Sequence, residues 1–117
     1  MRKIEQQMIT ALKERRNWQE SNTSVHWESG VATVHLFGNL IARYAPDEGE
    51  VSISDAGWRS ATTKSRLNAI LETFTGFNIF QRDFTWYITN GHESEPIYSP
   101  TSNGLTLKIE TESPAGD

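Results

Sequence analysis

The chain has 117 residues, no cysteine, 10% aromatic residues and a formal net charge of −4. This length suits one domain with a hydrophobic core of its own, and the lack of cysteine excludes a disulfide scaffold, a thiolate metal site and a cysteine nucleophile. No apolar run approaches the roughly 20 residues that span a bilayer, and no signal peptide is recognisable. We therefore expect a cytoplasmic protein without a membrane partner.

The first expected element is a helix over residues 3–16. Ile4, Met8, Ala11 and Leu12 recur at spacings of three and four, which is the period of an amphipathic helix. The last turn of this segment is basic, as the negative end of a helix dipole favours. The segment therefore predicts a helix with one apolar face for a core.

The period then changes to two, which indicates a meander of short strands. Ser29-Gly30 and Gly38-Asn39 are two-residue turn signals between the first three strands. The expected strands are residues 23–28, 31–37, 40–45 and 51–54. The expected pairs and core face are Val25 with Val34 and Trp27 with Ala32, joined by Leu36 and Ile41.

A second helix is expected over residues 64–73, after a loop at residues 55–62. Thr62 or Thr63 suits the N-cap position, and Gly76 is placed to end the helix. The apolar stripe of this helix consists of Leu67, Ile70, Leu71 and Phe74. This stripe predicts packing on the core face of the sheet.

A hairpin of residues 79–81 and 84–89 is expected next, with its turn at Arg82-Asp83. Residues 90–104 are rich in Gly, Pro, Ser and Asn and predict a loop, after which residues 105–109 form a possible extra strand.

The predicted fold class is α+β: an antiparallel β-meander with two helices packed on one face, plus a C-terminal β-hairpin and the possible extra strand. One domain is expected over residues 1–110, followed by a flexible acidic tail at residues 111–117. Charge is distributed unevenly, because residues 1–80 are neutral while residues 81–117 carry the whole net charge of −4. A polyanion could therefore bind the first part of the chain if its bases cluster.

The segment at residues 55–66 is the strongest candidate for a binding site. It brings cations, hydroxyls and an indole to the start of a predicted helix, where backbone N–H groups attract anions. The proposed contacts are phosphate capture by Arg59, Thr63, Lys64 and Arg66 and base stacking by Trp58. The alternative is a capped helix with exposed bases and a Trp that fills the core.

The aromatic hairpin is the second candidate. Strand alternation places Phe84, Trp86 and Ile88 on one face, which we expect to be core. On the other face, Tyr87 with Phe80 and Arg82 offers a stacking platform for a base. A single exposed Tyr is also an ordinary surface feature.

No pattern of residues indicates catalysis or a cofactor. His26 and His35 share a face of the sheet, but without a cysteine or a paired carboxylate they make a poor metal site. No phosphate-binding glycine loop and no nucleophile elbow occurs. We therefore expect a protein that is not an enzyme, with no cofactor and no metal.

A series of motifs resembles a family of small, uncharacterised proteins of tailed bacteriophages. The motifs are LFGNLIA at residues 36–42, SDAGW at 54–58, TTKSRLNAIL at 62–71, FQ at 80–81 and WY at 86–87. The similarity covers roughly residues 1–89. The resemblance implies an accessory protein that acts in the host bacterial cytoplasm, and it transfers no site residue.

Two functions from different classes remain open. The first is a non-catalytic accessory protein that binds nucleic acid, single-stranded DNA favoured, and supports phage replication or transcription, with a phage or host polymerase among its partners. The second is a protein-binding module that inhibits or redirects a host enzyme, with the acidic C-terminal third and exposed aromatics as its contact surface. Self-association stays open in both.

Overall fold

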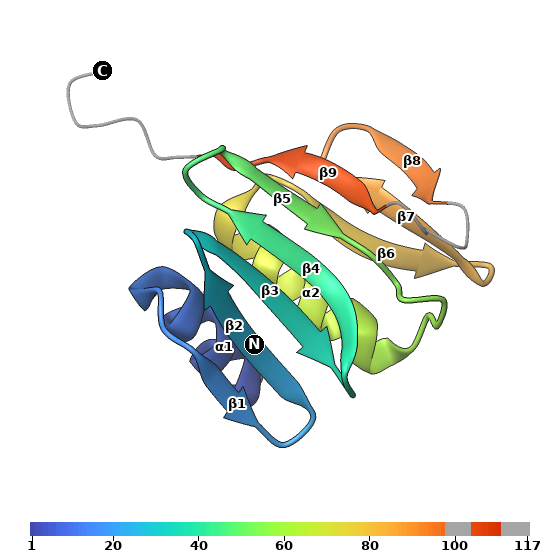
Figure 1. Cartoon of the computed structure of the whole chain (residues 1–117). Coiled ribbons are helices and arrows are strands. Elements are labelled where there is room, and N and C mark those ends of the chain that lie inside the picture. The colour runs from blue at the N-terminus through green and yellow to red at the C-terminus, as the bar shows by residue number, and fades with distance from the viewer. Residues whose placement is uncertain (98–103, 111–117) are drawn as a thin grey trace.

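The computed structural model describes residues 1–97 and 104–110, and Figure 1 shows how the elements are arranged. The chain forms an α+β fold with helices on an antiparallel sheet and a smaller second sheet. The element bounds are α1 Lys3–Glu14, β1 Trp18–Glu20, β2 Thr23–Glu28, β3 Val31–Leu36, β4 Asn39–Ala45, β5 Glu50–Ile53, α2 Ala61–Phe74, β6 Asn78–Arg82, β7 Thr85–Thr89, β8 Ser94–Ile97 and β9 Leu105–Lys108.

The larger sheet has six strands in the order β1-β2-β3-β4-β5-β9. The predicted meander forms its centre, and the predicted pairs Val25↔Val34 and Trp27↔Ala32 are confirmed. The extra strand β9 is also confirmed, and it pairs with β5 in antiparallel fashion. The short first strand, β1, was not predicted and adds an edge next to β2.

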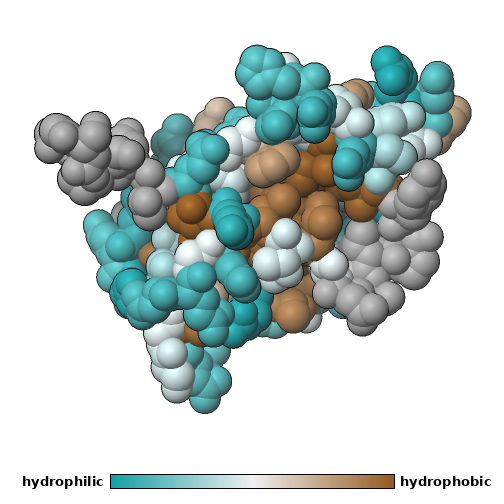
Figure 2. Space-filling model, turned by 90° about the horizontal axis from the view of Figure 1, so that it is seen from above, coloured by the Kyte–Doolittle hydropathy of each residue, from teal (hydrophilic) through white to brown (hydrophobic). Residues whose placement is uncertain are grey.

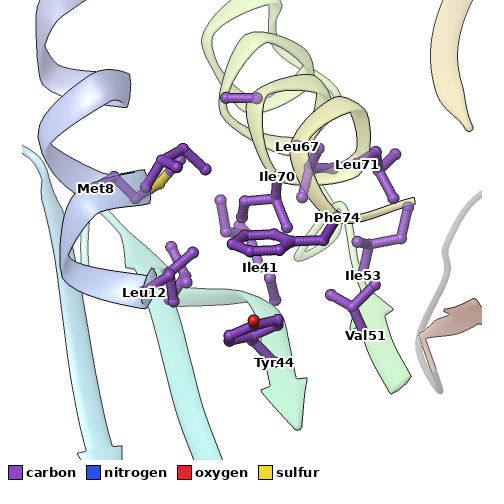
Figure 3. Packing of buried hydrophobic residues seen from close by; sticks show 14 of the residues in the cluster. Met8, Leu12, Ile41, Tyr44, Val51, Ile53, Leu67, Ile70, Leu71 and Phe74 are labelled. Atoms are coloured by element: carbon purple, nitrogen blue, oxygen red, sulfur yellow. The ribbon is translucent and has the colours of Figure 1, made fainter. Parts of the chain in front are cut away.

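One face of this sheet carries the hydrophobic core. Figure 3 shows Met8 and Leu12 of α1 and Ile70 and Phe74 of α2 gathered between the two helices and the sheet. Leu67, Ile70 and Leu71 are almost fully buried, so the predicted stripe of α2 is confirmed. The core side chains of β4 and β5 shown in the same view are Ile41, Tyr44, Val51 and Ile53.

The second sheet has three strands in the order β6-β7-β8 and covers the core beside α2. Its inner residues Ile79, Trp86 and Ile97 line a cavity of about 10 Å³ together with Ile53 and Leu105 of the larger sheet. A cavity of this size holds no ligand larger than one water. The inner face of the larger sheet is thus covered by α1, then α2, then the second sheet.

A side chain of α2 positions this second sheet. Asn68 donates from Nδ2 to the carbonyl oxygen of Ile79 at 2.8 Å, and its Oδ1 accepts from the N–H of Ile79 at 2.6 Å. The amide therefore satisfies the backbone edge of β6 as a neighbouring strand would.

Several local predictions are wrong. The N-cap of α2 is Ser60, whose Oγ accepts from the N–H of Thr63 at 3.0 Å, rather than Thr62 or Thr63. The hairpin turns at Asp83-Phe84, one residue later than predicted, so Phe84 is 94% exposed instead of lying in the core. The predicted loop at residues 90–104 contains β8, and the predicted tail at residues 111–117 lies outside the described residues.

Within the described residues, neither helix combines the length and the apolar character that a membrane crossing requires.

Candidate nucleic-acid interface

Arg66 lies inside the protein, between α1, α2 and β2. Its side chain is 4% exposed and its Nη1 donates to Oε2 of Glu5 at 2.7 Å. Its Nε donates to Oγ1 of Thr23 at 3.0 Å, and its Nη2 donates to Oδ1 of Asn22 at 3.3 Å. The hydroxyl of Ser65 also donates to Oε2 of Glu5, at 2.6 Å. We call these five residues the polar junction.

The carboxyl group of Glu5 favours its charged form although it is buried. Burial by itself raises the pKa of Glu5, but hydrogen bonds from Ser65, from the backbone N–H of Arg2 and from Arg66 outweigh burial. The net result is a pKa below the usual range of a glutamate. The polar junction is thus a buried ion pair in which each guanidinium nitrogen of Arg66 and each carboxyl oxygen of Glu5 has a hydrogen-bond partner. The prediction that the charged end of Arg66 lies in solvent is wrong.

The first turn of α2 is a capped helix start. Thr63 is buried, and its hydroxyl shares a 2.9 Å hydrogen bond with the hydroxyl of Ser60. Lys64 is half-buried, and no ion pair is found for it among the described residues. Of the predicted phosphate contacts on this helix, only Lys64 has a side chain that reaches solvent.

Arg59 joins the loop before α2 to the second sheet. Its Nε donates to Oδ2 of Asp55 at 2.9 Å, and its guanidinium lies 5.0 Å from the ring centroid of Trp86. The side chain is only 15% exposed, so the prediction that its charged end lies in solvent is also wrong. Its Nη2 is buried without a hydrogen-bond partner in the described part of the chain. The cation is engaged in holding the hairpin against the loop.

Trp58 is exposed to 63%, so it does not fill the core. It follows Ala56 and Gly57, which both have positive φ values of 55° and 81°. The carboxyl Oδ1 of Asp55 accepts from the N–H of Gly57 at 2.7 Å, which fixes this tight loop. The loop therefore presents the indole of Trp58 to solvent.

The outer face of the second sheet has the stacked arrangement that the hairpin pattern predicts. The rings of Phe80 and Tyr87 are stacked, with centroids 5.2 Å apart and an interplanar angle of 10°. The guanidinium of Arg82 lies 5.4 Å from the centroid of the Tyr87 ring. We call Phe80, Arg82 and Tyr87 the stacking face.

The stacking face is free of carboxylates. Because Ile79, Trp86 and Ile97 point to the core, the residues that alternate with them along each strand point outward. The outward set is Asn78, Phe80, Arg82, Thr85, Tyr87, Thr89, Ser94 and Pro96. Aromatic rings, one arginine, hydroxyls and an amide therefore share this surface, although the chain as a whole is acidic.

Exposed aromatic residues also occur on turns at one end of the molecule. Phe37 is 61% exposed in the β3–β4 turn, and Phe84 is exposed in the β6–β7 turn. The N–H of Ser54 donates to the carbonyl oxygen of Ile41 at 2.8 Å, so the loop that carries Trp58 begins beside the β3–β4 turn. The contact between Arg59 and Trp86 brings the same loop to the β6–β7 hairpin, and Figure 1 shows these connections at one end. We call Phe37, Trp58 and Phe84 the aromatic end.

The structure thus separates the predicted site residues into groups. Thr63 and Arg66 are buried, Arg59 is held by Asp55 and Trp86, and Lys64 is half-buried. Trp58 belongs to the aromatic end, while Arg82 and Tyr87 belong to the stacking face. The predicted convergence of three cations around the start of α2 does not occur.

Two aromatic residues were not singled out for exposure, Phe37 and Phe84. The turn between β3 and β4 consists of Phe37 and Gly38, one residue earlier than the predicted Gly38-Asn39, so that prediction is wrong and Phe37 lies at the turn instead of ending a strand. A shift of the same size exposes Phe84, because moving a hairpin turn by one residue changes which side chain lies at the tip.

No cluster of three or more metal-ligating side chains occurs within residues 1–97 and 104–110. His26 is exposed on the open face of the larger sheet, and His35 is half-buried on the same face.

Comparisons with known proteins place the chain in a family. No curated protein and no solved structure matches it. A family model does match, over residues 1–108, which extends beyond the roughly 89 residues of the resemblance described above. The chain belongs to the bacteriophage family described as Kyanoviridae Gp96 protein.

Proposed function

We propose that this phage protein is a non-catalytic accessory protein that binds single-stranded nucleic acid, with single-stranded DNA favoured, in the cytoplasm of the bacterial host. The proposal assigns it a supporting role in phage replication or transcription, beside a phage or host polymerase. The observation that carries the proposal is the stacking face. Proteins that bind single strands combine aromatic rings, on which bases stack, with cations that contact the backbone.

The geometry of the stacking face suits this task. Phe80 and Tyr87 offer a pair of nearly parallel rings, and the exposed Arg82 lies beside Tyr87 as a cation for the backbone of a single strand. The surrounding hydroxyls and the amide of Asn78 add neutral hydrogen-bonding groups. The one carboxylate of β8, Glu95, does not oppose binding on this face, because it alternates to the other side of its strand.

Fluorescence anisotropy with labelled single-stranded DNA, single-stranded RNA and duplex DNA tests the proposal. Tyr87→Leu removes a π-surface while keeping an apolar side chain, and we expect it to weaken binding by about 1–3 kcal/mol. Arg82→Gln should weaken binding for all sequences and reduce the salt dependence by about 0.7 log units on single strands.

Arg43→Gln is the matched control for Arg82→Gln. Arg43 is an exposed arginine on the larger sheet, and its Nη1 pairs with Oε2 of Glu48 at 3.3 Å. The Arg43→Gln substitution removes the same charge as Arg82→Gln. If both arginine variants weaken binding equally, general charge rather than the stacking face is responsible. If the parent protein binds no oligonucleotide at low salt, the proposal fails.

A second candidate function rests on the aromatic end: a protein-binding module that inhibits or redirects a host enzyme. Phe37 and Phe84 have φ values of 51° and 65°, a left-handed conformation that is costly for a bulky residue. Exposed aromatic side chains are typical anchors of protein interfaces, and strained backbone conformations cluster at functional sites. Affinity capture from host extract with the parent protein and with Trp58→Ala tests this candidate function. We expect the parent to retain a host protein that the Trp58→Ala variant does not retain.

A further inference from the structure

The strand β9 lies at the end of the larger sheet and, in the part of the chain that the structure describes, one of its backbone edges has no partner strand. Within the described residues, β9 pairs only with β5. The N–H of Ile109 donates to the carbonyl oxygen of Gly49 at 2.9 Å, on the β5 side. Backbone groups alternate along a strand, so those of Thr106 and Lys108 point away from β5.

The free edge is limited at both ends. On one side, the N–H of Glu110 already donates to the carbonyl oxygen of Phe74 at 2.9 Å. On the other side, Gly104 has a φ of 75°, which is outside the strand conformation. Thr106 and Lys108 are therefore the residues of β9 whose outward N–H and C=O groups are available.

An apolar surface runs along this edge. Leu105, Leu107 and Ile109 of β9 are only half-buried and pack at the margin of the core. Ile97 of the neighbouring edge strand β8 lines the same small cavity as Leu105. Figure 2 looks down on this side of the molecule and shows a band of hydrophobic surface across it. Within the described residues, the edge thus combines unpaired backbone with half-buried apolar side chains, which is the combination that strand addition uses.

We propose that two copies of this chain pair through antiparallel β9 strands about a two-fold axis at Leu107. In this register Thr106 lies opposite the partner's Lys108, and each such pair exchanges both of its N–H···O=C hydrogen bonds. The two free positions of each strand are then all used. Such an interface is self-complementary, as a two-fold contact requires.

The side chains agree with the same register. On the apolar face, Leu107 lies opposite the partner's Leu107, and Leu105 lies opposite the partner's Ile109. Thr106 and Lys108 project from the other face and are exposed, so the ammonium group of Lys108 stays in water. A register centred on Thr106 would place Lys108 opposite the left-handed Gly104, and one centred on Lys108 would place Thr106 opposite the occupied N–H of Glu110.

A single introduced cysteine tests the register, because the chain has no cysteine of its own. The Cα atoms of Leu107 and the partner's Leu107 are about 4.5 Å apart in a non-hydrogen-bonded pair, within the range of a disulfide. Leu107→Cys should form a covalent dimer under mild oxidation. Lys108→Cys is the control, since its Cα atoms would be roughly 8 Å apart, given the rise per residue and the strand spacing.

A second pair of variants tests the backbone pairing. Lys108→Pro removes an N–H that points away from β5, so β9 keeps its pairing with β5, whereas Lys108→Ala removes the charge and keeps the N–H. Light scattering after size-exclusion chromatography should give a dimer for the parent and for Lys108→Ala, and a monomer for Lys108→Pro. Circular dichroism establishes that each variant is folded.

The proposal is overturned if the parent is a monomer at every concentration tested, or if Lys108→Cys cross-links as readily as Leu107→Cys. It is also overturned if a folded Lys108→Pro variant remains a dimer. The stacking face lies on a different sheet, so none of these outcomes depends on whether the protein binds nucleic acid.

Discussion

The polar junction and the aromatic end depart in opposite ways from the rule that charged side chains lie at the surface and aromatic side chains lie in the core. In the polar junction, an arginine and a glutamate are buried between helices. At the aromatic end, Phe84, Trp58 and Phe37 are exposed at 94%, 63% and 61%. The polar junction is stable because each charge has its partner, whereas the aromatic end has no partner in the described chain. The comparison shows that exposure depends on contacts distant in sequence more than on residue type.

The largest expected effect comes from breaking the ion pair of the polar junction. Glu5→Gln leaves the guanidinium of Arg66 buried beside a neutral amide, and we expect a loss of about 3–5 kcal/mol in the free energy of unfolding. Urea denaturation followed by circular dichroism measures this loss. The double variant with Glu5→Leu and Arg66→Leu should recover much of it, because no unpaired charge remains. A loss as small as that of an exposed ion pair would contradict the assigned burial.

The polar junction should also respond to acid. The folded state holds the pKa of Glu5 below its usual range, whereas in the unfolded chain a glutamate titrates at about 4.3. The stability that this shift contributes is therefore fully present above about pH 4.3, and it is lost as the pH falls through the folded value. We expect the advantage of the parent over Glu5→Gln to shrink in urea titrations at descending pH. An advantage that stays constant down to strongly acidic pH would contradict this.

A smaller loss is expected from the contact that joins the aromatic end to the second sheet. Arg59→Ala removes a charge-assisted hydrogen bond to Asp55 and the packing over Trp86. We expect a loss of about 1.5–3 kcal/mol, with a change in Trp fluorescence as Trp86 gains solvent. Lys64→Ala, which removes a nearby cation with no ion pair in the described chain, should leave both readings near those of the parent.

The smallest effect should be a gain in stability. Phe84→Asn places a residue that tolerates positive φ at the hairpin tip, and Phe84 buries almost nothing there. We expect a gain of about 1 kcal/mol and a corresponding rise in the melting temperature, because the left-handed conformation costs most residues about 1–2 kcal/mol and costs Asn less. Phe37→Asn should act in the same direction. A destabilised Phe84→Asn variant would show that the ring packs on the protein in solution.

The sequence predicts the central strands well because alternation and two-residue turns act together. The Ser29-Gly30 turn fixes the register of Val25 and Val34, so both their pairing and their burial follow from local pattern. β1 has only three residues, and β8 contains Pro96 and Glu95, so neither resembles a typical strand. These strands form because a sheet edge is available beside them.

The candidate site is harder to predict, because its cations look alike in sequence. Arg66 stands four residues before Ile70, on the apolar stripe of α2, and Glu5 stands three before Met8 on the stripe of α1. One charge of each sign on two core-facing stripes was the available signal for the polar junction. Alternation along the hairpin places Arg82 on the face of Phe80 and Tyr87, whereas no local pattern shows that Arg59 is held by Asp55 and Trp86.

The bidentate contact of Asn68 with Ile79 also limits how the chain can vary in length. The amide holds one backbone position of β6, so the residues between α2 and β6 act as a spacer of fixed length. Deleting Gly76 would bring the next residue, Phe80, to the position held by the amide. Because side chains alternate, the side chains of β6 would then exchange sides, with Phe80 turned to the interior and Ile79 to solvent. Insertions and deletions should therefore be tolerated in the turns at Gly49 and Gly91 far better than in this connection.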